Sequence, residues 1–354
     1  MSDVETAAAP AAEPIRTEVV IVGAGPCGLF QVFELGLLGI KAHLLDSLAA
    51  AGGQCTELYP DKPIYDIPAL PICGAQELVD RLLQQIKPFD PQFHFGEEVL
   101  EVTPLEGGRF RVGTSAGTVF DAGAIVIAAG VGSFQPRRLG VPGGEPFEGR
   151  QIHYRVRSAA EYRGKALVIF GGGDSALDWA LDFAPTASSL TLVHRRSEFR
   201  AAPASVVKMR DLVASGRMRS VQGLAESVQV EADRLCGVVV KDADGTRHSL
   251  PAEHVFAFFG LHPKLGPVAG WGLALERKAL RVDTEKFQTS VPGIFAVGDI
   301  NTYPGKKKLI LSGFHEAALA AFGIQAHLYP EKKQFLQYTT TSPVMQKRLG
   351  VTMI

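Results

Sequence analysis

The strongest constraint on this chain is a pattern of strand, glycine-rich turn, helix and strand that occurs twice. In the first copy the turn 23–28 follows a short apolar run, and the second strand ends at Asp46. In the second copy the turn 171–176 follows a similar run, and the second strand leads to His194. The residue at the strand end follows the first glycine by 23 positions in both copies. One glycine motif is weak evidence, but two copies with equal spacing predict two nucleotide-binding units.

The two copies differ in the residues that would select the ribose. Glycines in such a turn let the backbone approach a pyrophosphate at the positive N-terminus of the following helix. Asp46 can accept hydrogen bonds from ribose hydroxyls and would repel a 2′-phosphate, which fits FAD or NAD. His194 is instead followed by arginines, whose guanidinium groups bind phosphate in bidentate fashion. Arg195, Arg196 and Arg200 therefore predict a preference for NADP, although a solvated cationic turn is the alternative.

Composition excludes several other classes of protein. The length of 354 residues suggests about two domains. Lys+Arg 36 nearly balances Asp+Glu 37, so the chain lacks the basic field of a nucleic-acid binder. No apolar run approaches the roughly 18 residues of a membrane-spanning helix. The four cysteines match no zinc-ligand spacing and no disulfide framework, so we expect no metal site.

The two ends of the chain carry less pattern. Residues 1–14 are rich in Ala and Pro and contain acidic residues without Lys or Arg, unlike a secretory signal. We therefore expect a frayed tail on a cytoplasmic protein. Residues 309–328 predict a long amphipathic helix, and 330–354 have little periodicity and are locally basic. Gly298-Asp299 ends a strand-like run, where Asp299 either contacts a flavin or caps a helix.

Together these motifs resemble the low-molecular-weight thioredoxin reductases from residue 18 to about 330. The shared elements are GAGPCG, GGQ, IAAG, GGGDSA, HRRSEFR and VGD. The resemblance implies an α/β fold with two Rossmann-like, three-layer ββα domains, in which the NADP domain is inserted into the FAD domain. The implied domains are a tail at 1–14, the FAD domain at 15–140 and 264–330, the NADP domain at 141–263 and a C-terminal extension over the flavin at 331–354.

One departure from that family changes the expected activity. Thioredoxin reductases carry a CxxC dithiol shortly before the second glycine turn, where this chain reads IHYRVR at 152–157. Cys236 has no partner nearby in the sequence. Because disulfide exchange needs two sulfurs, thioredoxin reduction is excluded. A flavin can accept a hydride and pass electrons on singly, so we expect a one-electron carrier as the acceptor.

The chain accordingly resembles the thioredoxin-reductase-like class of ferredoxin–NADP reductases. That class shares the loss of CxxC, the stretch LYPDKPIYDIP at 58–68, and an extension with an aromatic residue before a Thr-rich run. The resemblance implies FAD contacts at Gly23, Gly25, Pro26, Cys27, Gly28, Asp46, Gln54, Tyr59, Val99, Phe134, Asp299 and Thr340. The expected NADP contacts are Gly171, Gly172, Gly173, Asp174, Ser175, Ala176, His194, Arg195, Arg196 and Arg200. Tyr59 and Tyr338 are candidates for stacking on the flavin, and no side chain is expected to act as catalytic acid or base.

The resemblance also implies partners and motions. Ferredoxin or flavodoxin is the expected carrier, and a homodimer is expected because the extension often reaches the partner's flavin. Two connections between the domains form a hinge that permits rotation. An acidic carrier would favour a basic docking surface, for which the candidates are Lys306, Lys307, Lys308, Lys332, Lys333, Lys347 and Arg348. A solvated loop and tail are the alternative reading of these residues.

Other interpretations stay open at this point. His315 and Glu316 either relay a proton to the flavin or are ordinary surface residues of a helix. The enzyme could instead pass electrons from NADPH to a quinone, free flavin or oxygen. A protein that senses NADPH without turnover is the third possibility.

Overall fold

The computed structural model describes residues 13–132, 135–156, 158–262, 265–333 and 335–351. The chain divides into two compact units. Unit 1 contains residues up to 133 and from 263 onwards, and unit 2 contains residues 134–262.

Unit 1 is built on a mixed sheet around the first glycine turn. Its strand order is β5-β2-β1-β8-β7-β6, and β21 also pairs with β8. The pairs β1–β2, β1–β8, β2–β5 and β8–β21 are parallel, whereas β6, β7 and β8 form an antiparallel meander. These strands are β1 Ile15–Val22, β2 Ala42–Asp46, β5 Gln92–Phe95, β6 Val99–Pro104, β7 Phe110–Thr114, β8 Val119–Ile127 and β21 Ile294–Ala296.

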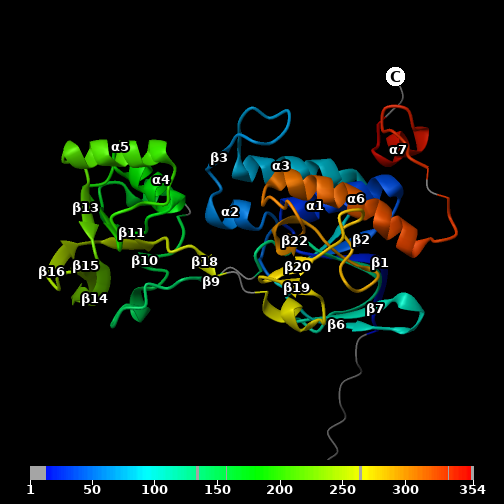
Figure 1. The fold of residues 1–354 in the computed structure, drawn as a ribbon, viewed down its shortest axis with the longest axis horizontal. Helices are drawn as coiled ribbons and strands as arrows, with labels where there is room; N and C mark the ends of the chain where they lie inside the picture. Colours follow the sequence, from blue (N-terminus) through cyan, green and yellow to red (C-terminus); the bar gives the residue numbers. More distant parts are fainter. Residues whose placement is uncertain (1–12, 133–134, 157, 263–264, 334, 352–354) are drawn as a thin grey trace, which may run out of the picture. The chain divides into compact units, whose positions relative to one another are not determined.

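Both faces of strand β1 are buried, which explains its continuous apolar sequence. Val19 and Ile21 belong to a core that includes residues of the helices α1 Pro26–Leu38, α3 Ala75–Ile86 and α6 Ile310–Leu328. These three helices lie along one face of the sheet (Figure 1). Val20 belongs instead to a second core, with residues of β7 and β8. The unit is therefore layered as helices, parallel sheet and meander.

Shorter elements complete unit 1. They are α2 Gln54–Leu58, β3 Pro63–Ile64, β4 Cys73–Gly74, β19 Leu275–Glu276, β20 Ala279–Arg281, β22 Asn301–Thr302 and α7 Pro343–Arg348. Short 3₁₀ helices occur at Lys87–Phe89, Glu106–Gly108, Gly266–Gly270 and Gly298–Ile300. The last of these, η6, contains Asp299.

Unit 2 repeats the layered plan around the second glycine turn. Its parallel sheet has the order β10-β17-β11-β12-β13, and an antiparallel sheet has the order β14-β15-β16. One face of the parallel sheet shares a core with residues of α4 and α5, and the other face with residues of β15 and β16. The elements are β10 Ile152–His153, β11 Ala166–Phe170, α4 Asp174–Phe183, β12 Ser189–His194, α5 Pro203–Ala214, β13 Arg219–Gln222, β14 Leu224–Glu231, β15 Arg234–Lys241, β16 Arg247–Pro251 and β17 His254–Ala257. The short strands β9 Gln135–Pro136 and β18 Leu261–His262 pair with each other, and 3₁₀ turns lie at Glu145–Phe147 and Ala159–Tyr162.

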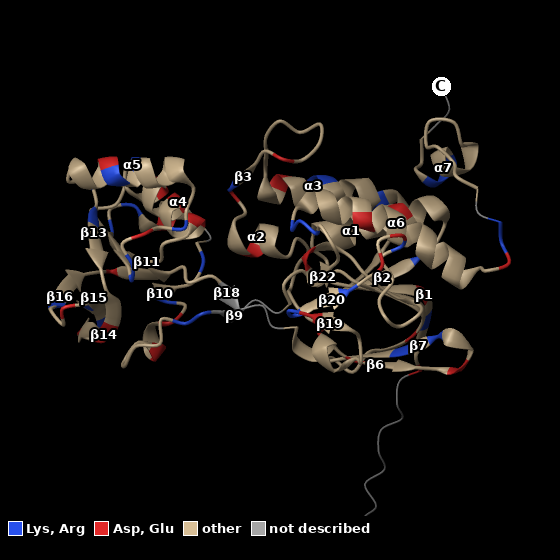
Figure 2. Cartoon of the chain, viewed as in Figure 1, with Lys and Arg blue, Asp and Glu red and all other residues tan. Residues whose placement is uncertain are grey.

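Two further features bear on the expectations from the sequence. The predicted long helix is confirmed as α6, but it is mostly buried or half-buried rather than amphipathic, because only Leu311, His315 and Ala326 of its residues are exposed. The aperiodic C-terminal stretch contains the additional short helix α7. Acidic and basic residues are mingled over both units, as the balanced composition predicts (Figure 2). Within the described residues, no helix combines the length and the apolar character needed to cross a bilayer.

Candidate functional site

The first glycine turn leaves open space where a phosphate group could approach the backbone. The Gly23 N–H donates to the Leu45 carbonyl oxygen at 2.8 Å, which fixes the turn at the end of β2. A methyl group on Gly28 would lie 1.9 Å from the Gly23 carbonyl oxygen, so the first turn of α1 requires glycine at this position. A methyl group on Gly25 would meet nothing within 4 Å. The backbone at Gly25 is thus accessible beside the N-terminus of α1, which fits a pyrophosphate.

Asp46 is held by the same turn. Its carboxylate accepts hydrogen bonds from the Ala24 N–H at 2.7 Å and the Leu48 N–H at 2.9 Å, one on each oxygen. Burial raises the pKa of Asp46, and these two hydrogen bonds act against that rise. Each oxygen retains a lone pair for a further donor. The carboxylate is therefore fixed and able to accept hydrogen bonds from ribose hydroxyls.

The GGQ segment at residues 52–54 lies against the first glycine turn. The Gly52 N–H donates to the Ala24 carbonyl oxygen at 2.9 Å, and a methyl group on Gly53 would lie 3.2 Å from Gly25 Cα. Gln54 begins α2 directly afterwards, and Tyr59 ends it. The Cys55 thiol lies 3.8 Å from the Tyr59 hydroxyl, and burial raises the pKa of that hydroxyl. The structure thus brings this segment together with Gly25.

Val99 and the C-terminal residues are placed differently. The Val99 side chain is buried in the same core as Leu45, just before Asp46. Tyr338 and Thr340 are exposed and precede α7, which packs against α1. Arg348 of α7 donates to the Leu37 carbonyl oxygen at 2.5 Å, at the C-terminal end of α1.

The structure anchors α7 at the C-terminal end of α1, on which the C-terminal residues of the described chain pack. The C-terminal end of α1 lies about 20 Å from the glycine turn, at 1.5 Å per residue. Helix α7 is therefore anchored about one helix length away from the first glycine turn. Phe134, another predicted FAD contact, lies outside the described residues.

Asp299 lies close to the start of α1 through Cys27. A methyl group on Gly298 would lie 3.0 Å from the Cys27 sulfur, so the two segments are in contact. The Asp299 carboxylate has no hydrogen-bond partner in the described part of the chain, and burial raises its pKa. Burial and the neighbouring carboxylates raise the pKa of Cys27 to about 12, so this thiol stays protonated. Asp299 is available to a ligand, and the Cys27 side chain packs against Gly298.

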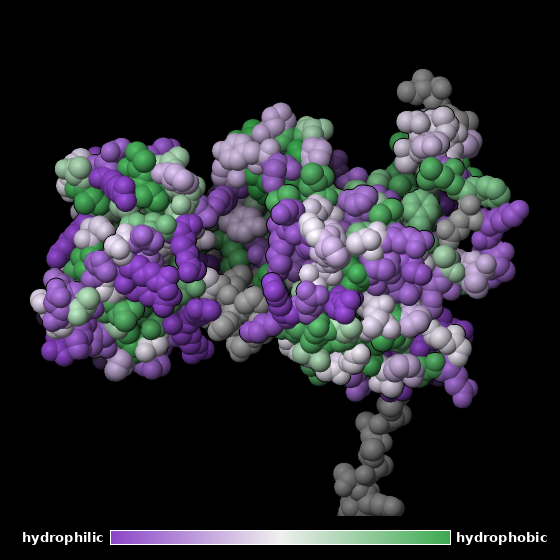
Figure 3. All heavy atoms as spheres, viewed as in Figure 1, coloured by the Kyte–Doolittle hydropathy of each residue, from purple (hydrophilic) through white to green (hydrophobic). Residues whose placement is uncertain are grey.

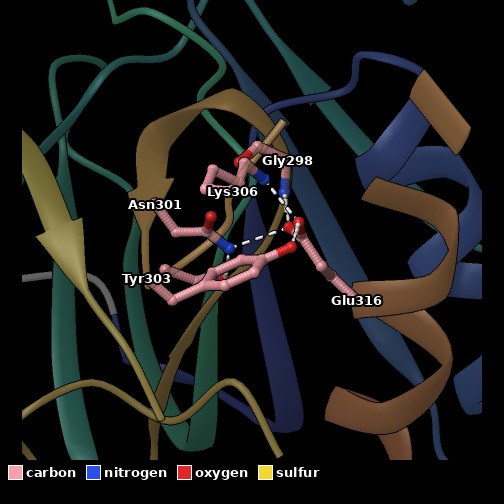
Figure 4. A network of polar contacts seen from close by, with 6 residues as sticks. Gly298, Asn301, Tyr303, Lys306 and Glu316 are labelled. Atoms are coloured by element: carbon pink, nitrogen blue, oxygen red, sulfur yellow. Dashed lines mark hydrogen bonds and ion pairs between the residues drawn. The ribbon is translucent and has the colours of Figure 1, made fainter. Parts of the chain in front are cut away.

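Lys306 and Glu316 lie inside unit 1 and not at its surface. The Glu316 side chain is 0% exposed and that of Lys306 is 6% exposed, and the two form an ion pair (Figure 4). Lys306 therefore cannot belong to a docking surface, because its ammonium group is bound inside the unit. Glu316 is not a surface residue of its helix, whereas His315 is exposed. Lys307 and Lys308 remain exposed.

The second glycine turn borders a cavity of about 550 Å³ in unit 2. The cavity is lined by residues at the carboxyl ends of β11, β12, β13 and β17, which is where ligands bind in open parallel sheets. A methyl group on Gly172 would lie 2.2 Å from the His194 ring, whereas one on Gly173 would meet nothing within 4 Å. The Arg200 N–H donates to the Gly172 carbonyl oxygen at 2.7 Å, and the Ala202 N–H donates to the Asp174 carboxylate at 2.8 Å. These bonds hold the arginine-containing loop against the turn.

His194 has a supporting position in this loop. Its ring stacks on Phe199 with centroids 5.1 Å apart, and its Nε2 lies 3.1 Å from the Glu198 carbonyl oxygen. Burial lowers the pKa of His194, and the three neighbouring arginines lower it further. The imidazole is therefore neutral near pH 7 and orients the loop. Arg195, Arg196 and Arg200 line the cavity, are exposed and have no ion-pair partner among the described residues.

Two lining residues were missed by the sequence reasoning. Arg137 and Arg138 border the same cavity, and Arg138 also pairs with Glu148 at 3.1 Å. Their only signal in the sequence is that two arginines are adjacent. Nothing in the sequence places them beside the glycine turn, because the contact is made through the folding of unit 2.

Comparison with known proteins identifies the family of the chain. The family model of the pyridine nucleotide-disulphide oxidoreductases matches residues 17–321. The chain belongs to this family. It is 60% identical over 342 residues to ferredoxin–NADP reductase 2 from Cupriavidus metallidurans, covering 97% of this chain and 93% of that protein. It is 61% identical over 343 residues to ferredoxin–NADP reductase from Albidiferax ferrireducens, covering 96% and 97% respectively.

Two solved structures of thioredoxin reductases share the fold. Thioredoxin reductase from Lactococcus lactis is 24% identical with a TM-score of 0.73, and the match covers 89% of this chain and 99% of that one. Thioredoxin reductase from T. acidophilum is 23% identical with a TM-score of 0.74, covering 88% and 98%. The predicted α/β fold with two Rossmann-like units is confirmed.

Proposed function

We propose that this oxidoreductase is an FAD-dependent ferredoxin–NADP(+) reductase, which exchanges hydride with NADPH and single electrons with ferredoxin. The observation that carries the proposal is a pair of open glycine turns that differ in charge beside the expected ribose. One has a carboxylate, which favours free ribose hydroxyls, and the other has arginines, which favour a 2′-phosphate. Asp46 stands at the first turn, and three unpaired arginines stand at the second. The 60% identity to proteins named ferredoxin–NADP reductase supports the same activity.

FAD fits the first turn. Gly25 leaves room for the pyrophosphate, Asp46 accepts from the ribose hydroxyls, and the unpartnered Asp299 accepts from the ribityl chain. Bound flavin supplies the ability to exchange two electrons as hydride and to release them one at a time. The chain itself would contribute binding and orientation of the two nucleotides.

NADPH fits the cavity of unit 2. Gly173 leaves the backbone open beside the N-terminus of α4, where the pyrophosphate would sit. Arg195, Arg196 and Arg200 offer charge-assisted hydrogen bonds to the 2′-phosphate. The neutral His194 keeps their loop in place without competing for the phosphate.

The cysteines support transfer to an external carrier. All four are free thiols, and all four lie in the described part of the chain. Burial is the main cause that raises the pKa of Cys27 to about 12 and that of Cys55 to about 11. Because only a thiolate attacks a disulfide, these two residues are inert and form no exchange centre.

The proposal also includes an electron carrier, ferredoxin or flavodoxin, and a homodimeric assembly. Lys307 and Lys308 are exposed and would attract an acidic ferredoxin or flavodoxin. A homodimer would place the C-terminal extension of one chain over the flavin of the other. The anchoring of α7 at the far end of α1 supports that route, because the extension starts away from its own turn. The phenol of Tyr338 is 63% exposed and free to stack.

The test is NADPH-dependent reduction of cytochrome c by the flavin-loaded protein, with and without ferredoxin. We expect strong dependence on ferredoxin, with NADPH preferred over NADH. Replacing Arg195, Arg196 and Arg200 by Ala should raise the KM for NADPH by about tenfold or more and leave the KM for NADH nearly unchanged. The variant K307E/K308E should lose more ferredoxin-dependent rate than dye-dependent rate.

Two results would overturn the proposal in different ways. Rapid reduction of a quinone or dye without any effect of ferredoxin would keep the cofactors and replace the acceptor. Binding of NADPH without oxidation by any acceptor would make the protein a sensor.

A further inference from the structure

A buried network of charged and polar side chains lies directly beneath the Gly298-Asp299 turn. Figure 4 shows these side chains converging on Glu316, which comes from α6. One carboxylate oxygen accepts from the Gly298 N–H at 2.7 Å and from the Asn301 amide at 2.8 Å. The other accepts from the Tyr303 hydroxyl at 2.9 Å and from Lys306. The network therefore fastens the whole segment 298–306 to α6.

The two members of the ion pair bind the two backbone polar groups of Gly298. Glu316 accepts from the N–H of Gly298, and the Lys306 ammonium donates to the carbonyl oxygen of Gly298 at 2.9 Å. Gly298 has a φ of +78°, a conformation that few other residues adopt. With its N–H and its carbonyl both bound, the orientation of Gly298 is fixed. The backbone that leads into the next residue, Asp299, is held with it.

The stability of the unit by itself gives little reason for charged side chains at these positions. Burying a carboxylate and an ammonium costs free energy, and replacing a buried pair by apolar residues is often neutral or stabilising. Here Lys306 and Glu316 bind the backbone of Gly298, the residue before Asp299. The Asp299 carboxylate itself has no hydrogen-bond partner among the described residues. The pair thus supports a binding residue, as supporting side chains do at other preorganised sites.

We propose that Glu316 and Lys306 are positioning residues for the flavin, acting through Gly298 on Asp299. This inference rests on the proposed function in that it takes FAD as the ligand of the first turn. The pair holds the Asp299 carboxylate in its binding orientation before the cofactor arrives. It also places a fixed dipole, the Gly298 peptide, beside the site.

The test separates positioning from simple stability with a double-mutant cycle. The variants are K306M, E316Q and K306M/E316Q, with K41M as the matched control because Lys41 is an exposed lysine of the same unit. Urea unfolding of the apoprotein measures stability. FAD titration of the apoprotein gives the Kd, and redox titration of the loaded protein gives the midpoint potential.

We expect each single variant to lose stability, because one buried charge is left without its partner. The double variant should regain most of that stability. Its Kd for FAD should nevertheless stay weaker by about tenfold or more, since the charge-assisted hydrogen bond to Gly298 is lost. Its midpoint potential should differ from that of the wild type, and K41M should match the wild type in every measurement.

The opposite outcomes are equally clear. A double variant that regains stability and binds FAD within about twofold of the wild type, with an unchanged potential, would overturn the inference. Failure of the wild-type chain to bind FAD would instead reject the proposed function, so the two failures are distinguishable.

Discussion

Gly25 and Gly28 belong to one turn but tolerate a side chain very differently. A methyl group on Gly28 would overlap the Gly23 carbonyl oxygen at 1.9 Å, whereas the space at Gly25 is open. Gly25 also has an ordinary extended conformation, with a φ of −71°. We expect G25A to leave the stability of the apoprotein within about 0.5 kcal/mol of the wild type. It should weaken FAD binding by about tenfold or more, because the methyl group occupies the approach of the pyrophosphate.

G28A provides the matched comparison. Forcing a methyl group against the backbone should cost about 1–3 kcal/mol or more of stability. Urea unfolding of the apoprotein and FAD titration check both variants. Full FAD affinity in G25A would show that the phosphate does not approach the backbone at this glycine.

At the scale of the element, strands β10 and β17 are joined by a pair of histidines. His153 Nε2 lies 3.0 Å from His254 Nδ1, and both rings contact Tyr162. Burial lowers the pKa of both, that of His153 to about 4, and His254 lowers the pKa of His153 further. Between about pH 6.5 and pH 4 the unfolded chain therefore binds more protons than the folded chain. The stability of unit 2 should fall as the pH falls through this range.

The variant H153F tests this dependence, because a phenyl ring keeps the stacking on Phe256 but cannot titrate. We expect a smaller loss of the urea midpoint between pH 7 and pH 4.5 than in the wild type. The fluorescence of Trp179 reports on unit 2 in a W271F background, since these are the two tryptophans of the chain. Equal pH dependence in both proteins would show that other groups govern the acid response.

At the scale of the whole molecule, the C-terminal extension is anchored in one place and proposed to act in another. Apolar residues gather at the surface around α7 (Figure 3). Among the described residues of the extension, the large exposed apolar side chains are Phe335, Leu336, Tyr338, Val344 and Val351. Such a set is typical of a surface that a second copy covers. We expect a chain ending at Pro330 to dimerise more weakly, to change its flavin absorption spectrum and to reduce oxygen faster.

Light scattering, absorption spectroscopy and oxygen uptake measure these three effects. The variant V351S is the control for a single apolar change at the chain end. A truncated protein with the spectrum, the rates and the assembly state of the full chain would place the extension away from any flavin.

The sequence allowed much of each site to be predicted. The two turns were recognised because a βαβ unit is encoded by contiguous residues, with the glycines and the strand-end residue at fixed distances. The selectors Asp46 and Arg195 followed from the same spacing. Arg137 and Arg138 were missed, because only the folding of unit 2 brings them to the cavity.

The run of three lysines after Asp299 shows the limit of such reasoning. The sequence alone presents Lys306, Lys307 and Lys308 as equivalent exposed cations. In the structure the first is buried against Glu316, and the other two are exposed. Burial depends on which segments pack together, and α6 supplies the carboxylate from a later part of the chain. The sequence by itself determined the fold class, the two glycine turns and the residues proposed to select the ribose, since these lie at fixed spacing within contiguous βαβ units. Only the tertiary structure decided which charges are buried beneath Gly298 and where the C-terminal helix is anchored, since both are contacts between distant segments.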